Sequence, residues 1–125
     1  MHIPAVVPLP ATVLSLSFNR EKLRSRQAAL EAGGFRVVSV GTAGQAWFEI
    51  DMGQCEIFLT CSKIPTDIIQ DLVTVFRRRC WFGTIIMVGA GSEDQFADVD
   101  IMIPQSDDPQ GIVEALRLDS RVKAS

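Results

Sequence analysis

Apolar residues gather in five short runs along the chain, separated by stretches in which apolar positions recur at helical spacing. The runs lie at residues 12–17, 35–40, 56–61, 84–88 and 99–103. Each run is short and nearly continuous in apolar residues, as in Ile85-Ile86-Met87-Val88, which is typical of strands buried on both faces of a parallel sheet. We therefore expect five strands.

The first helical pattern has recognisable ends. It begins after Asn19, a good N-cap, and stops at the glycine pair 33–34. Leu23, Gln27 and Leu30 share one face, which we expect to point inward. Basic residues occupy other positions of this helix, which we expect to face solvent. They are Arg20, Lys22, Arg24 and Arg26.

Three further helical patterns follow. The second opens at residues 42–45 with Thr-Ala-Gly-Gln, which is a capping-box pattern, and ends at Gly53. The third follows Pro65 and runs to about Arg79, and the last starts at Asp108-Pro109. The residues expected to be buried are Ala46, Trp47 and Ile50 in the second helix, Ile68, Ile69, Leu72, Val73 and Phe76 in the third, and Ile112, Val113 and Leu116 in the last.

Strands that alternate with helices indicate an α/β fold, a parallel sheet with helices on both faces. One interval is too short for a helix between two strands, because only ten residues separate Val88 from Val99. A crossover with a full helix needs a dozen residues or more. We expect a shortened or missing fourth helix and a thinly covered flank beside the last two strands.

The 125 residues are enough for one domain with a single core, which we place at residues 11–118. Residues 1–10 contain three prolines and are expected to form an extended arm, and residues 119–125 a tail. Apolar residues make up 47% and charged residues 22%, so disorder is not indicated. No apolar stretch is long enough to span a membrane.

Charge and cysteine content narrow the function classes. The net charge of −3 is uneven, because residues 1–92 carry nine Lys/Arg against seven Asp/Glu and residues 93–125 carry three against eight. This balance argues against nucleic-acid binding and suits a protein partner. The thiols Cys55, Cys61 and Cys80 and the single His2 show no zinc spacing, so we expect a reduced, cytoplasmic chain without metal or cofactor.

The ends of the predicted strands carry no acidic residue and no histidine. They read Ser-Phe-Asn at 17–19, Val-Gly-Thr at 40–42, Cys-Ser-Lys at 61–63, Gly-Ala-Gly at 89–91 and Ile-Pro at 103–104. Ligands and catalytic groups of open α/β sheets gather beyond these ends. We therefore expect no enzymatic activity.

Three stretches, read in order, resemble the receiver domain of bacterial two-component response regulators. They are residues 34–47, residues 56–65, and residues 100–104 with Asp107-Asp108-Pro109. The resemblance covers roughly residues 11–118. It implies a flavodoxin-like, doubly wound sheet of five parallel strands in the order 2-1-3-4-5.

The same resemblance implies where the family's phosphotransfer chemistry would lie. The acceptor position falls on Cys61, counting back from Pro65, and the acidic pair that holds Mg²⁺ falls on Ser17 and Phe18. The hydroxyl position falls on Gly89 or Ala90, and the lysine position on Ile103. Since carboxylates bind this hard cation, we expect a non-phosphorylatable receiver-like module for protein–protein interaction in bacterial two-component-type signalling.

Two alternatives remain open from the sequence. Cys61 would serve thiol-dependent phosphotransfer or redox chemistry, against the simpler interpretation of a small buried residue. A small-ligand site at the strand ends is the other alternative, and it requires a polar-lined pocket that Phe18 does not fill.

The candidate interaction residues are an aromatic at the end of the first strand, a basic run and a second aromatic. A homodimer through the thin flank is one arrangement of such contacts. The basic run has a structural interpretation as well, in which it complements a helix dipole while Trp81 and Phe82 close the core. The candidates are Phe18, Arg77, Arg78, Arg79 and Phe96.

Overall fold

Strands and helices alternate along the chain, as the apolar pattern predicts. The computed structural model describes residues 11–89, 99–103 and 109–118. The predicted arm (1–10), the predicted tail (119–125) and the segment in which a shortened fourth helix is predicted (90–98) lie outside the described residues. The elements are β1 (Thr12–Leu16), α1 (Arg20–Ala32), β2 (Arg36–Val40), α2 (Ala43–Met52), β3 (Ile57–Cys61), α3 (Thr66–Arg79), β4 (Thr84–Val88), β5 (Ile101–Ile103) and α4 (Gln110–Leu118).

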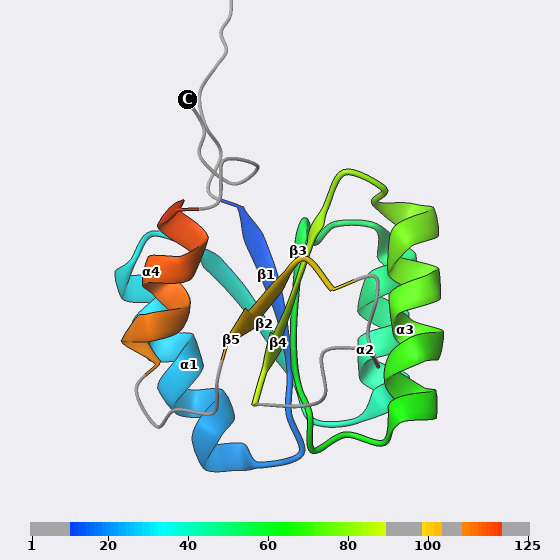
Figure 1. Cartoon of the computed structure of the whole chain (residues 1–125), viewed down its shortest axis with the longest axis horizontal. Coiled ribbons are helices and arrows are strands. Elements are labelled where there is room, and N and C mark those ends of the chain that lie inside the picture. Colours follow the sequence, from blue (N-terminus) through cyan, green and yellow to red (C-terminus); the bar gives the residue numbers. More distant parts are fainter. Residues whose placement is uncertain (1–10, 90–98, 104–108, 119–125) are drawn as a thin grey trace, which may run out of the picture.

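The five strands form one parallel sheet in the order β2-β1-β3-β4-β5. Leu14 is aligned with Val38 of β2 on one side and with Phe58 of β3 on the other. All five carboxyl ends therefore lie along one edge of the sheet, which is the lower edge in Figure 1. The flavodoxin-like, doubly wound fold implied by the resemblance is confirmed.

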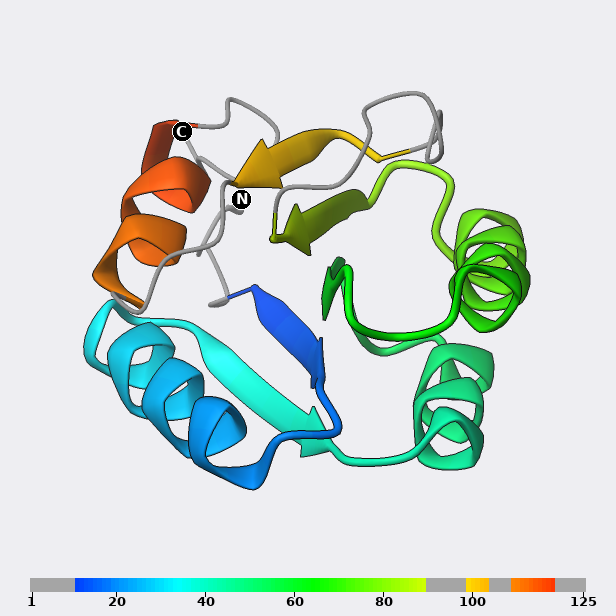
Figure 2. The same cartoon turned by 60° about the horizontal axis from the view of Figure 1, so that its bottom comes forward.

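Among the described elements, two helices cover each face of the sheet. Figures 1 and 2 show α1 and α4 together on one face and α2 and α3 on the other. The Ser39 hydroxyl donates to Gln27 Oε1 of α1 at 2.9 Å, and on the opposite face the rings of Phe58 and Phe76 lie 5.8 Å apart. Because side chains alternate along a strand, Cys61 lies on the face opposite Phe58, the α1 face.

The predicted helix starts are built as the capping residues indicate. Asn19 Oδ1 accepts a hydrogen bond from Lys22 N–H at 3.0 Å at the start of α1, and Thr42 Oγ1 accepts from Gln45 N–H at 3.1 Å at the start of α2. Gly53, at φ 73°, ends α2 in the left-handed conformation that glycine adopts without strain. These caps satisfy N–H groups that have no partner within the helix.

Three aromatic residues expected in the core lie outside it. Trp47 is 47% exposed, because α2 turns only Ala46 and Ile50, four residues apart, toward the sheet. Trp81 and Phe82 are 79% and 58% exposed and stack edge to face on the turn after α3. The chain packs against the core at the next residue, Gly83, where an added Cβ would lie 2.7 Å from the Phe76 ring.

The predicted inward positions of α3 and α4 are occupied as expected. Ile69, Leu72 and Phe76 of α3 are buried, and α4 buries Ile112, Val113 and Leu116. In the part of the chain that the structure describes, no helix is both long and apolar enough to cross a membrane.

Candidate functional site

A cavity of about 250 Å³ opens at the carboxyl edge of the sheet, where the chain leaves β1, β3 and β4. The first turns of α1 form its side wall, at the lower edge in Figure 1. We call this cavity the strand-end pocket. It is lined by Ser17, Phe18, Asn19, Lys22, Arg26, Cys61, Ser62, Lys63, Ile64, Val88 and Gly89.

The end of β1 and the start of α1 provide one wall. Ser17 is buried, and its hydroxyl accepts a hydrogen bond from Asn19 N–H at 3.1 Å, which fixes the turn into the helix. Lys22 lies in the first turn of α1 and Arg26 one turn later. Residues four apart lie on the same side of a helix, so both cationic side chains line the pocket.

Arg26 is the unexpected residue of this wall. Its side chain was predicted to face solvent, but it is only 5% exposed, and its Nη1 atom has no hydrogen-bond partner among the described residues. The reason is its phase on α1. Arg26 follows Leu23 by three residues and precedes Leu30 by four, so it shares the inward stripe of the helix. That spacing is the signal that identifies it.

The end of β3 forms the opposite wall. Cys61 is 9% exposed and is followed by a tight turn, in which Ile64 N–H donates to the Cys61 carbonyl at 3.3 Å. Ser62 N–H donates to the Val88 carbonyl at 2.9 Å and ties this turn to β4. Lys63 is exposed at the rim. The predicted acceptor position is thus a nearly buried thiol beside a cation.

Gly89 closes the pocket at the end of β4. Its N–H donates to the Ile103 carbonyl at 2.8 Å, and its φ of 103° is a conformation that side chains rarely adopt. A Cβ at this position would collide with Ser62 Oγ. Of the two residues predicted for the family's hydroxyl, Gly89 lies at the pocket and Ala90 lies outside the described residues.

The described residues that line the pocket carry three cations and no carboxylate. Lys22, Arg26 and Lys63 are the charged members, and hydroxyls of Ser17 and Ser62 add polar character. No cluster of three or more His, Cys, Asp or Glu side chains occurs within the described ranges. A divalent cation needs oxygen ligands, mainly carboxylates, so these residues do not fit the Mg²⁺ ion of receiver phosphorylation.

Phe18 lines the pocket but does not fill it. The side chain is 54% exposed, so the cavity beside it stays open. The sequence analysis requires a polar-lined pocket at the strand ends for a small-ligand site. Ser17, Lys22 and Arg26 provide such a lining. Phe18 thus offers an apolar surface at the rim of a cationic cavity.

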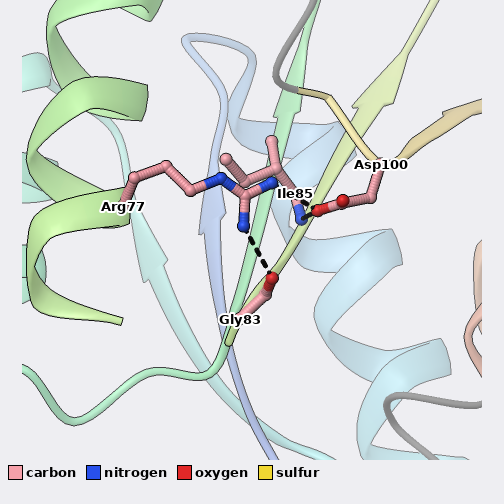
Figure 3. Close-up of polar contacts among 4 residues, drawn as sticks. All are labelled: Arg77, Gly83, Ile85 and Asp100. Atoms are coloured by element: carbon pink, nitrogen blue, oxygen red, sulfur yellow. Dashed lines mark hydrogen bonds and ion pairs between the residues drawn. The ribbon is translucent and has the colours of Figure 1, made fainter. Parts of the chain in front are cut away.

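The three arginines of the basic run lie at the other end of α3, remote from the pocket. Arg77 Nη1 donates to the Gly83 carbonyl at 2.8 Å, and its Nη2 lies 2.6 Å from Asp100 Oδ2 (Figure 3). Arg79 forms an exposed ion pair with Asp51 at 2.7 Å.

Arg77 and Arg79 therefore hold parts of this chain together. Arg78 is exposed at the same helix end. Phe96, the remaining candidate, lies outside the described residues.

The other two thiols do not line the strand-end pocket. Cys55 and Cys80 are free and buried. Burial raises the pKa of Cys55 to about 11, helped by the nearby carboxylates Glu49 and Glu56. Burial also raises the pKa of Cys80, with a further contribution from Glu56. Both thiols are therefore protonated at neutral pH, and Cys61 is the cysteine that lines the pocket.

The sheet order, the paired helices on each face and the pocket at the carboxyl edge are the architecture of the CheY-like receiver domain. No family model matches the chain, and a search of curated proteins found no match. Solved receiver structures do match over most of the chain.

The similar structures include response regulators and a protein described as a pilus assembly protein. The chemotaxis response regulator CheY4 of Vibrio cholerae aligns with a TM-score of 0.77 at 13% identity, covering 86% of this chain and 97% of that chain. The response regulator TrrA of Thermotoga maritima, in complex with Mg²⁺-BeF, aligns at 0.73 and 13%, covering 86% and 96%. A pilus assembly protein (cpaE) of Burkholderia thailandensis aligns at 0.68 and 17%, covering 86% and 95%. At these identities the likeness establishes the fold.

Proposed function

We propose that the chain is a receiver-like module of bacterial two-component-type signalling that has lost aspartyl phosphorylation and acts by contacting other proteins in the cytoplasm. The observation that carries this proposal is the reversed charge of the strand-end pocket. Lys22, Arg26 and Lys63 line it, and Cys61 stands at the acceptor position. Three cations disfavour Mg²⁺, and none of the lining residues within the described ranges is a carboxylate that would accept a phosphoryl group.

Exposed aromatic side chains support a protein partner. Phe18, Phe48, Trp81 and Phe82 are each more than half exposed, and large exposed apolar groups on soluble domains commonly mark contact sites. The first lies at the pocket, so a partner that contacts it also covers the cavity.

Phosphodonor treatment tests the loss of phosphorylation. The protein is incubated with acetyl phosphate, and separately with beryllofluoride, each with and without Mg²⁺, and intact mass and fluorescence are recorded. We expect no Mg²⁺-dependent mass increase and no Mg²⁺-dependent spectral change, because none of the described lining residues offers the carboxylate that this cation needs. The response regulator TrrA of Thermotoga maritima, whose solved structure is in complex with Mg²⁺-BeF, serves as the parallel control. A stable Mg²⁺-dependent adduct on this chain would contradict the proposal.

The alternative function uses the Cys61 thiol for phosphotransfer or redox chemistry. Its support is the position of Cys61 in the wall of the pocket, beside Ser62 and Lys63. No described lining residue is a histidine or a carboxylate that would act as its base. Iodoacetamide labelling separates the two functions. Fast labelling of Cys61 in the folded protein supports thiol chemistry, and labelling that accelerates only on unfolding excludes it.

A further inference from the structure

Arg26 is a buried cation, and none of the residues that the structure describes accepts a hydrogen bond from its Nη1 atom. Its side chain is 5% exposed. A guanidinium stays charged under all ordinary conditions, and burying an unpaired charge is strongly unfavourable. Among the described residues, no anion balances the charge of Arg26 in the wall of the strand-end pocket.

The surroundings of Arg26 attract the same kind of ligand. Lys22 lies one turn earlier on α1, and Lys63 extends from the turn after β3 on the other side of the cavity. Ser17 and Ser62 place hydroxyls between them. Three cations from two separate segments converge on one cavity, and among the lining residues that the structure describes no carboxylate neutralises them.

The size of the cavity limits the ligand. Its volume of about 250 Å³ falls just below the ~300–1,000 Å³ typical of drug-sized ligands. The rim and floor are apolar at Phe18, Ile64 and Val88. A ligand with a compact anionic group and a small apolar or aromatic part suits a cavity that is cationic on its walls and apolar at its rim and floor.

We propose that the strand-end pocket binds a small phosphate monoester, noncovalently and without a divalent cation. The fork of Arg26 donors matches the oxygens of a phosphate. Three positive charges suit a phosphate dianion better than a single carboxylate. The flanking apolar residues would receive the organic part of the ester. No covalent bond forms, so the site differs from aspartyl phosphorylation in both chemistry and residues.

Calorimetric titration at low ionic strength, with EDTA present, tests the proposal. The probes are phenyl phosphate, inorganic phosphate and benzoate. We expect saturable binding of one molecule of phenyl phosphate per chain, weaker binding of inorganic phosphate, and the weakest binding of benzoate. Added salt should weaken all three interactions.

Substitutions in α1 and at the rim assign the binding to the pocket. We expect Arg26→Gln to weaken phenyl phosphate binding by roughly ten-fold or more, and Lys22→Gln and Lys63→Gln by roughly three- to ten-fold each. Arg24→Gln is the matched control, because Arg24 is an exposed cation of the same helix that does not line the pocket. It should change affinity less than about two-fold. If Arg26→Gln does not fold, Lys22→Gln and Lys63→Gln carry the test.

Two results would overturn the site. One is the absence of saturable binding of phenyl phosphate up to about 10 mM, beyond the weak end of ordinary affinities. The other is an equal loss in Arg24→Gln, which would reduce the effect to general attraction by a basic helix. Either result leaves the loss of aspartyl phosphorylation untouched, and a Mg²⁺-dependent adduct would not by itself remove phosphate ester binding measured in EDTA. The two proposals therefore fail separately.

Discussion

Cys55 is a buried thiol whose protonation contributes to stability. It is 4% exposed, and its pKa is raised to about 11 by burial and by Glu49 and Glu56. The folded chain thus keeps this proton to a higher pH than the unfolded chain, whose thiol titrates near its ordinary value of 9.0. Above that value the unfolded state binds fewer protons, so stability falls as pH rises.

The pH dependence gives the first residue-scale prediction. We expect the free energy of unfolding to fall by about 1–2 kcal/mol between pH 9 and pH 11 through this group. Urea denaturation at a series of pH values measures the fall in the wild type and in Cys55→Ala. The variant should show a shallower decline, because the titrating group is gone. Parallel curves for the two proteins would contradict this account of Cys55.

At the same scale, spacing on the helix determines burial more strongly than chemical character. Arg26 is charged but lies in phase with Leu23 and Leu30, and it is buried. Trp47 is aromatic but lies out of phase with Ala46 and Ile50, and it is 47% exposed. Assigning inward positions by hydrophobicity alone therefore missed the cation that defines the pocket, whereas the helical stripe contains it.

At the scale of elements, Arg77 and Asp100 connect three of them. Arg77 of α3 donates to Gly83, just before β4, and pairs with Asp100, just before β5 (Figure 3). Asp100 Oδ2 also accepts from Ile85 N–H at 2.8 Å. The Asp100 side chain thus accepts the hydrogen bond that a backbone carbonyl of the neighbouring strand would otherwise accept from Ile85 N–H. This explains why β5 begins at Ile101 rather than at residue 99 as predicted.

Removal of Asp100 should be far more costly than removal of an exposed ion-pair partner. We expect Asp100→Ala to lower the free energy of unfolding by about 2–3 kcal/mol, because it leaves Ile85 N–H and part of a half-buried guanidinium without their acceptor. The matched control is Asp51→Ala, whose pair with Arg79 is exposed and worth about 0–1 kcal/mol. Chemical denaturation compares the two. Equal losses would contradict the role assigned to Asp100.

Elements were predictable because their signals are local. The caps at Asn19 and Thr42 and the stop at Gly53 lie within a few residues of the backbone groups that they serve. Runs of apolar residues likewise mark strands buried on both faces. Each of these signals acts through neighbours in sequence. The two caps and the stop at Gly53 are confirmed, and β3 and β4 are buried along their whole length, whereas β2 and β5 are only partly buried.

At the scale of the whole molecule, the sheet ends in a short apolar strand. Among residues 11–89, 99–103 and 109–118, no strand pairs with the outer side of β5, and Met102 on this strand is 36% exposed. An open apolar edge is a template for association with a further chain. A second copy of this chain is the partner that we propose for this edge.

Sedimentation velocity tests self-association. We expect the wild type to dimerise with rising concentration and Met102→Lys to shift toward monomer, because a charge on an edge strand opposes pairing. Met52→Lys is the matched control, since Met52 is an exposed methionine of α2, which packs near the opposite edge of the sheet. Concentration-independent monomer in the wild type, or equal shifts in both variants, would contradict a dimer at β5.

The strand-end pocket is formed by residues from several elements of the molecule, and for that reason the sequence revealed it only in part. The missing acids at the strand ends were visible residue by residue. The convergence of Lys22 and Arg26 with Lys63 was not, because these residues meet only through the order and register of β1, β3 and β4. The sequence therefore indicated what the site lacks, and the fold shows what it contains.

Gly89 restricts how this chain can change over evolutionary time. A serine or threonine there would force a side chain onto a backbone at φ 103° and into Ser62 Oγ, so a hydroxyl cannot be regained by one substitution at no cost. A chain with a hydroxyl side chain at this position would have to change Gly89 and Ser62 together. A side chain added at Gly89 alone should make the protein less stable than the present chain, because both the backbone conformation and Ser62 Oγ oppose it.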